Sequence, residues 1–170
     1  MSEAAIIPLD NVDPAIVEEV LDRAFGLVRH ERTAYKVREG MDWLPALSFA
    51  ALDDSDMLVG TIQCWPVALT DTAGKPHPMI MVGPVAVVPE QQGSGFGKAL
   101  VTASLAGIDD RAPLPLVMIG DAEYYGRWGF TAEHTGGWSL PGAFEQHRLL
   151  VRCDNPAVLP KDGTLGPWAR

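Results

Sequence analysis

A glycine-rich segment in the middle of the chain has the residues and the spacing needed to bind a phosphate group. The apolar run 85–88 is followed by Gly93, Gly95 and Gly97, and an amphipathic segment begins at Phe96. Glycine adopts positive φ readily and lets the backbone approach a ligand closely, because it has no Cβ. The amide groups of such a turn converge, and the following helix adds unpaired N–H groups and its dipole. The segment therefore predicts a phosphate or pyrophosphate site.

Two common phosphate-binding motifs do not fit this segment. A Walker A loop has a glycine five residues before its Gly-Lys pair and a Ser or Thr after the pair. Here Gln92 stands five residues before Gly97, and Ala99 follows Lys98. A dinucleotide-binding fingerprint has the spacing Gly-x-Gly-x-x-Gly, usually in the first βα unit, whereas this run is one residue shorter and lies in mid-chain. The spacing therefore disfavours a nucleotide-binding switch.

Two motifs instead resemble those of one protein family. The run Gln92-Gly93-Ser94-Gly95-Phe96-Gly97 resembles the acetyl-CoA pyrophosphate loop of the GCN5-related N-acetyltransferase (GNAT) superfamily, which follows a strand with a Gln/Arg-x-x-Gly-x-Gly pattern. The segment Tyr124-Tyr125-Gly126-Arg127-Trp128-Gly129-Phe130 is similar to the Tyr-x-x-x-Gly-Phe block of that superfamily. The flanking residues also look like the YhbS-like branch of predicted acetyltransferases. The specific resemblance covers residues 82–130.

The resemblance implies a fold and an activity. The fold would be α/β (α+β) of the GNAT type, with a mixed, mostly antiparallel central sheet of six to seven strands, a splayed central pair and about four flanking helices. Residues 1–170 would form a single domain, with 155–170 as a surface tail. The activity would be transfer of an acetyl group from acetyl-CoA, without a metal, to a small-molecule or protein amine in a ternary complex. A catalytically silent acetyl-CoA-binding sensor or interaction module is the alternative.

The resemblance also gives roles to individual residues. Backbone N–H groups of the strand before the loop would contact the thioester carbonyl. Tyr125 would protonate the departing thiolate, since a phenol is an acid of suitable strength, and a packing aromatic with a locally bonded hydroxyl is the alternative. The residues expected to bind the co-substrate are Val85, Ala86 and Val87 on the strand, and Gln92, Gly93, Ser94, Gly95, Phe96, Gly97 and Lys98 in the loop.

The amine acceptor and the general base are less well defined by the sequence. Gln63 and Trp65 alternate onto one face of a predicted strand, where family architecture would place the acceptor, and Trp43 is nearby in order. A tryptophan can stack on a cationic amine, with core packing as the alternative. Residues 79–88 contain no carboxylate, so no base is assigned. The candidates elsewhere are His77, His134, Glu133 and Glu123, and a water relay or a free amine is equally open.

Composition limits the classes of partner. The chain has 170 residues, of which 47% are hydrophobic and 21% charged, as expected of a soluble globular domain. Its net charge of −9 argues against a nucleic-acid partner, because phosphate backbones require a basic surface. Cys64 and Cys153 lack a CxxC partner and predict neither a disulfide framework nor a metal site. No signal-peptide or membrane-spanning pattern is present, so we expect a cytoplasmic protein, and a homodimer through strand edges is left open.

Periodicity and breakers predict the elements that would position these residues. Asp13 and Pro14 start a helix that Gly26 ends, and Gly83-Pro84 predicts an irregularity within a strand because proline cannot donate to the sheet. The other predicted helices cover 31–39, a segment from 96 to about 109, and a short segment after Asp121. The predicted strands cover 5–9, 47–52, 58–67, 79–87, 114–119, 131–140 and 147–153.

Overall fold

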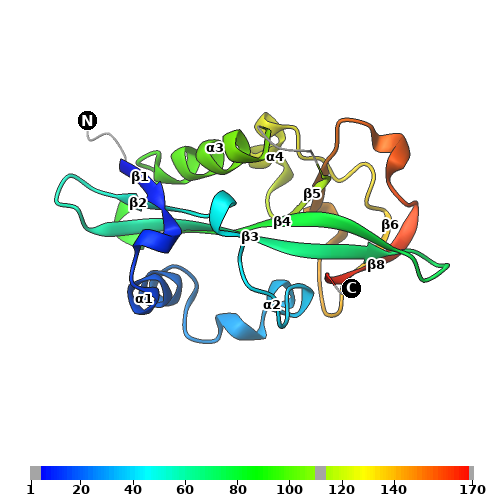
Figure 1. Ribbon diagram of the computed structural model, residues 1–170, viewed down its shortest axis with the longest axis horizontal. Helices are drawn as coiled ribbons and strands as arrows, with labels where there is room; N and C mark the ends of the chain where they lie inside the picture. Colours follow the sequence, from blue (N-terminus) through cyan, green and yellow to red (C-terminus); the bar gives the residue numbers. More distant parts are fainter. Residues whose placement is uncertain (1–4, 110–113, 169–170) are drawn as a thin grey trace. The chain divides into compact units, whose positions relative to one another are not determined.

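The computed structural model describes residues 5–109 and 114–168, which form a mixed sheet and helices (Figure 1). The strands are β1 (Ala5–Pro8), β2 (Phe49–Leu52), β3 (Leu58–Thr70), β4 (Pro76–Val87), β5 (Leu116–Ile119), β6 (Gly137–Ser139), β7 (Leu149–Arg152) and β8 (Asp162–Pro167). The α-helices are α1 (Pro14–Phe25), α2 (Thr33–Val37), α3 (Phe96–Asp109) and α4 (Ala122–Tyr125). The strand order is β1-β2-β3-β4-β5-β7, and β8 pairs with both β3 and β6. The predicted fold class is confirmed.

The described chain divides into two compact units, and strands β3 and β4 each contribute to both. The first unit holds residues 5–30, 43–64 and 83–109, and the second holds 31–42, 65–82 and 114–168. No helix among the described residues is long and apolar enough to cross a membrane.

The first unit is a helix–sheet–helix arrangement. Strands β1, β2 and β3 are antiparallel, with Ile6 opposite Ala51 and Ala50 opposite Thr61. Helix α3 packs on β1 and β2, and α1 lies on the other face of these strands (Figure 1). The start of α1 is as predicted, because the side chain of Asp13 accepts a hydrogen bond from the Ala15 N–H at 2.9 Å.

The two faces of β3 are distinguished by one buried contact. Cys64 Sγ lies 3.1 Å from Ser104 Oγ on α3, so the Cys64 side chain points to the α3 face. Successive side chains of a strand point to opposite faces. Thr61 and Gln63 therefore point to the α1 face, and both are buried there.

The second unit contains the parallel strand pair of the mixed sheet. Strand β5 pairs in parallel with β4 at only two positions, Ile80 opposite Leu116 and Met81 opposite Val117. Strand β4 continues to Val87, and the predicted irregularity is present at Gly83, where φ is +124°. The short register agrees with the splayed central pair expected of the fold.

The C-terminal segment corrects one prediction. Residues 155–170 were expected to be a surface tail, but β8 (162–167) pairs antiparallel with β3, and its Leu165 is buried. Within the described part of the chain the sheet therefore has eight strands rather than six or seven. The composition of this segment is misleading, because a glycine such as Gly163 usually indicates a loop. Here the glycine lies in a strand, and a Cβ at this position would lie only 2.7 Å from the carbonyl oxygen of Thr70. The glycine is required by close strand packing.

Three other predicted elements are shorter in the structure. The helix expected over 31–39 is reduced to α2, preceded by a 3-10 turn at Arg29–Glu31. The strands expected over 131–140 and 147–153 are reduced to β6 and β7, and Thr131 forms only an isolated bridge with Val151. Turn-forming residues such as Gly136 and Pro141 bound the shortened β6.

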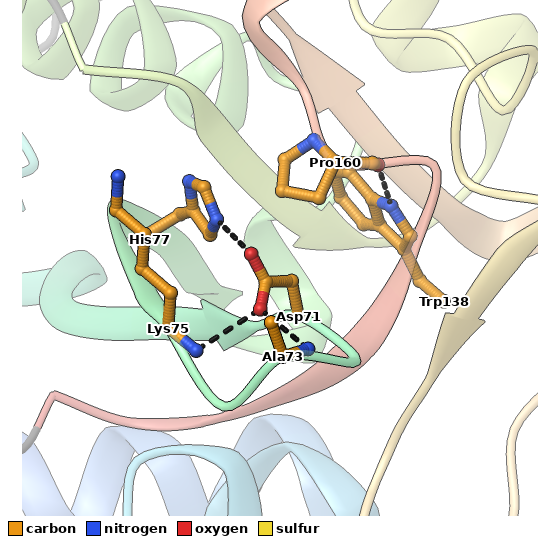
Figure 2. A network of polar contacts seen from close by, with 6 residues as sticks. All are labelled: Asp71, Ala73, Lys75, His77, Trp138 and Pro160. Carbon is orange, nitrogen blue, oxygen red and sulfur yellow. Dashed lines mark hydrogen bonds and ion pairs between the residues drawn. The ribbon is translucent and has the colours of Figure 1, made fainter.

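The side chain of one aspartate, Asp71, bonds across the turn of the hairpin between β3 and β4 (Figure 2). Asp71 Oδ1 accepts hydrogen bonds from the backbone N–H groups of Ala73 and Lys75, and Asp71 Oδ2 lies 2.8 Å from His77 Nε2. These bonds, with that of His77 the largest cause, lower the pKa of Asp71. In the same view the indole N–H of Trp138 donates to the carbonyl oxygen of Pro160 at 2.8 Å.

Candidate active site

The glycine-rich loop has the backbone geometry that its sequence predicts at two of its three glycines. Gly93 and Gly95 have φ of +85° and +89°, while Gly97 lies within the first turn of α3 and does not share this conformation. A Cβ built at residue 93 or 95 would meet no atom within 4 Å. The space beside the loop is therefore open, and the positive φ values require glycine for conformational rather than packing reasons.

The start of α3 adds donors and charge to this loop. Phe96 is buried and anchors the helix start, and the N–H of Ala99 makes the first α-helical bond, to the Gly95 carbonyl at 3.1 Å. The amides before Ala99 thus lie at the helix N-terminus, where N–H groups have no acceptor within the helix. Lys98 is exposed and forms no ion pair with any described residue. A glycine turn at positive φ, a helix N-terminus and a lysine without an ion pair in the described chain together fit a diphosphate.

The side chain of Gln92 contacts the strand that precedes the loop. Its side-chain Nε2 donates to the carbonyl oxygen of Val87 at 3.1 Å, so its amide is engaged by the end of β4. The side chain therefore holds the loop against the strand.

The strand residues expected to contact the thioester lie in the same unit as the loop. Ala86 is buried, while Val85 and Val87 are half-buried. Strand β3 approaches β4 closely here, because a Cβ at Gly60 would lie 3.0 Å from the carbonyl oxygen of Ala86. Gly60 was not identified from the sequence as part of the site, although a glycine inside an apolar strand run is a signal of close backbone approach.

Tyr125 lies in the second unit, at the end of α4. Its ring covers Gly120, where a Cβ would lie 2.7 Å from the tyrosine Cε2, and it packs edge-on against Tyr124 with centroids 4.9 Å apart. Its hydroxyl has no hydrogen-bond partner among residues 5–109 and 114–168. Burial, with a smaller contribution from Tyr124, raises the pKa of Tyr125 to about 12. The phenol is therefore a neutral hydrogen-bond donor at physiological pH.

The candidate bases occupy varied positions. His77 is bound to Asp71 in the β3–β4 hairpin (Figure 2), and Glu123, Glu133 and His134 are exposed. No set of three or more His, Cys, Asp or Glu side chains in the described part of the chain is placed to hold a metal ion.

The two residues expected near an acceptor occupy different environments. Gln63 lines a cleft of about 130 Å³ in the first unit, together with Trp43. Trp65 belongs to the second unit and is buried, and the guanidinium carbon of Arg38 lies 3.8 Å from its ring centroid. A cation therefore does stack on Trp65, but it is supplied by the chain itself.

Comparison with known proteins gives consistent matches. The sequence profile of the Acetyltransferase (GNAT) domain family matches residues 8–132. The uncharacterized N-acetyltransferase YhbS of Escherichia coli strain K12 is 28% identical over 143 residues, covering 81% of this chain and 83% of YhbS. The uncharacterized N-acetyltransferase YjhQ of the same strain is 27% identical over 165 residues, covering 86% of this chain and 90% of YjhQ.

Solved structures show the same fold. The crystal structure of E. coli YhbS in complex with CoA has a TM-score of 0.74 at 22% identity, covering 99% of this chain and 91% of that one. A GNAT family acetyltransferase from Brucella melitensis in complex with acetyl-CoA has a TM-score of 0.63 at 24% identity, covering 98% and 97%.

Proposed function

The chain belongs to the GNAT acetyltransferase family, and we propose that it transfers the acetyl group of acetyl-CoA to an amine. The observation that carries this proposal is the open glycine loop at the N-terminus of α3, with Gly93 and Gly95 at positive φ. Acetyl-CoA supplies the acetyl group as a thioester: the amine nitrogen bonds to the acetyl carbon, and the C–S bond breaks. The proton that the nitrogen loses to solvent balances the one that the CoA thiolate takes up from it, so CoA is released as a thiol.

The loop and the strand before it would bind the co-substrate. The amides of the loop and the Lys98 ammonium would hold the diphosphate through charge-assisted hydrogen bonds. The backbone of Val85, Ala86 and Val87 would orient the acyl end and donate N–H groups to the thioester carbonyl. Gly60 supports this arrangement, because it lets β3 lie close to Ala86.

Tyr125 would act on the departing sulfur by donating a hydrogen bond. Its pKa of about 12 exceeds the value of about 8.5 for an unperturbed thiol, so complete proton transfer from the phenol to a thiolate is uphill. A hydrogen bond to the developing negative charge needs no such transfer and lowers the barrier. The unpartnered hydroxyl supports this role.

Direct attack by the amine is supported by the state of the cysteine in the first unit. Cys64 is buried, and desolvation raises the pKa of its thiol to about 12. A neutral, inaccessible thiol is a poor acyl carrier, because the thiolate is the nucleophile. This argues against a covalent relay through Cys64, and direct attack in a ternary complex needs no such carrier.

Release of free thiol from acetyl-CoA, detected with Ellman's reagent over a panel of amines, tests the proposal. We expect release that depends on both the amine and the enzyme. Saturable binding of acetyl-CoA with no amine-dependent release would instead indicate a binding module. Absence of both binding and release would refute the proposed function altogether.

A further inference from the structure

The cleft that contains Gln63 has the composition of a cation-binding site. It lies in the first unit, on the α1 face of β3, and its polar lining consists of Asp10, Glu18, Trp43 and Gln63, with Leu9 and Val17 among the apolar residues. Its volume is about 130 Å³, and a water molecule takes up about 30 Å³ of liquid. The cleft therefore has room for several water-sized groups, which suits one charged group and a short alkyl stem.

Gln63, one of the residues that line this cleft, has a buried acceptor without a partner in the described part of the chain. The residue is 3% exposed, and its side-chain Oε1 has no hydrogen-bond partner within the described residues. Buried polar atoms are almost always hydrogen-bonded, because an unpaired one loses its hydration without compensation. A ligand that donates an N–H to Gln63 Oε1 would supply the missing partner.

The charges around the cleft are acidic. Two carboxylates line it, and no Lys, Arg or His does. Glu18 pairs with Arg29, but Arg29 Nε also lies 3.0 Å from Asp22 Oδ1, so this one cation is shared between two carboxylates. Asp10 is exposed and forms no ion pair with a described residue. The cleft therefore favours a positive charge, and the half-buried Trp43 adds an aromatic surface that attracts cations.

We propose that this cleft binds a primary alkylammonium group and selects acceptors that carry two amino groups on an alkyl chain. The inference rests on the proposed acetyl transfer. An ammonium offers three N–H donors, of which one would bond to Gln63 Oε1 while Asp10 supplies the opposite charge. A neighbouring carboxylate keeps such a group protonated, and a protonated amine has no lone pair with which to attack. The group held in the cleft is therefore the non-reacting end, and a second amine receives the acetyl group.

Calorimetric titration with non-transferring CoA present, and again without it, tests the site without turnover. The probe is 1,4-diaminobutane, and its neutral isostere 1,4-butanediol is the control ligand. We expect the diamine to bind about tenfold more tightly than the diol, from one partly desolvated ion pair and one cation–π contact. Equal affinities for the diamine and the diol, or binding of neither, would overturn the proposal.

Three variants assign the binding to the cleft. Asp10→Asn changes an exposed side chain and should weaken diamine binding about threefold, and Gln63→Met removes the buried acceptor at similar volume and should weaken it about tenfold. Asp54→Asn, an exposed turn residue outside the cleft, makes the same charge change as Asp10→Asn and should leave the affinity unchanged. Folding of each variant is checked by thermal unfolding. Unchanged affinity in folded Asp10→Asn, or an equal loss in Asp54→Asn, would contradict the site.

The two proposals can fail separately. If the diamine binds in a way that depends on Asp10 but no amine is acetylated, the cation site is supported and the proposed function is refuted. If other amines are acetylated but the diamine does not bind, the proposed function is supported and the cation site is refuted.

Discussion

Gln92 Nε2 donates a hydrogen bond to the carbonyl oxygen of Val87 over 3.1 Å, and this bond joins the glycine loop to the end of β4. The loop supplies donors for a diphosphate, and β4 supplies the backbone beside which the acyl end is proposed to lie. The bond therefore couples the two parts of the proposed co-substrate site within one unit of the protein.

Gln92→Leu should weaken acetyl-CoA binding about two- to tenfold, because a neutral hydrogen bond that preorganises the loop is lost. Gln91→Leu is the matched control, since it removes the adjacent amide, which makes no hydrogen bond to Val87. Calorimetric titration of acetyl-CoA gives both affinities. Equal affinities in the two variants would show that the Val87 bond has no part in binding.

Gly95→Ala should reduce acetyl-CoA affinity, whereas Gly74→Ala should not. Both glycines have similar φ, +89° and +84°, and a Cβ at either would meet no neighbour within 4 Å. Each variant should therefore lose about 1–2 kcal/mol of stability from backbone strain. Only the Cβ at residue 95 would enter the space proposed for the diphosphate. If binding fell equally in both, strain rather than the site would be responsible.

Tyr125→Phe should lower kcat by about ten- to a hundredfold with little change in the KM for acetyl-CoA, because a hydrogen bond to a developing charge is lost only in the transition state. Tyr124→Phe is the control, since its ring packs edge-on against Tyr125 and carries a hydroxyl of the same kind. Steady-state kinetics with a fixed amine measure both. A wild-type kcat in the Tyr125→Phe variant would show that the Tyr125 hydroxyl does not assist departure of the sulfur.

Alkaline conditions should destabilise the fold. Burial raises the pKa of Cys64 from 9.0 to about 12 and that of Tyr125 from 10.0 to about 12, so the folded state keeps both groups neutral. The unfolded chain releases these protons first, and the stability present below pH 9 is lost as the pH rises toward 12. Each group should increase the unfolding equilibrium constant by up to about tenfold per pH unit in its window.

Urea unfolding at several pH values measures this slope. Cys64→Ala should show a shallower decline between pH 9 and 12 than the wild type, whatever its stability at pH 7. A decline of the same steepness in the variant would exclude Cys64 as a contributor.

Structural features that depend on neighbouring residues could be predicted from the sequence, whereas contacts between distant residues could not. The turn at Gly93 and Gly95 and the Asp13 cap depend on residues a few positions apart, and both appear in the structure as predicted. Strand β8 could not be recognised, because Gly163 is needed to avoid Thr70, which is distant in the chain. The cleft could be predicted only in part: the sequence indicates Gln63 and Trp43 near an acceptor, but not Asp10, which is distant in the chain and lines the same cleft.

Backbone amide NMR during a titration with CoA tests the central claim most directly. If the loop binds the diphosphate, the amide resonances of Gly93, Gly95 and Gly97 should shift early and saturate with the affinity measured by calorimetry. Saturable binding that leaves these amides unmoved while resonances elsewhere shift would contradict the assignment of the co-substrate site to this loop.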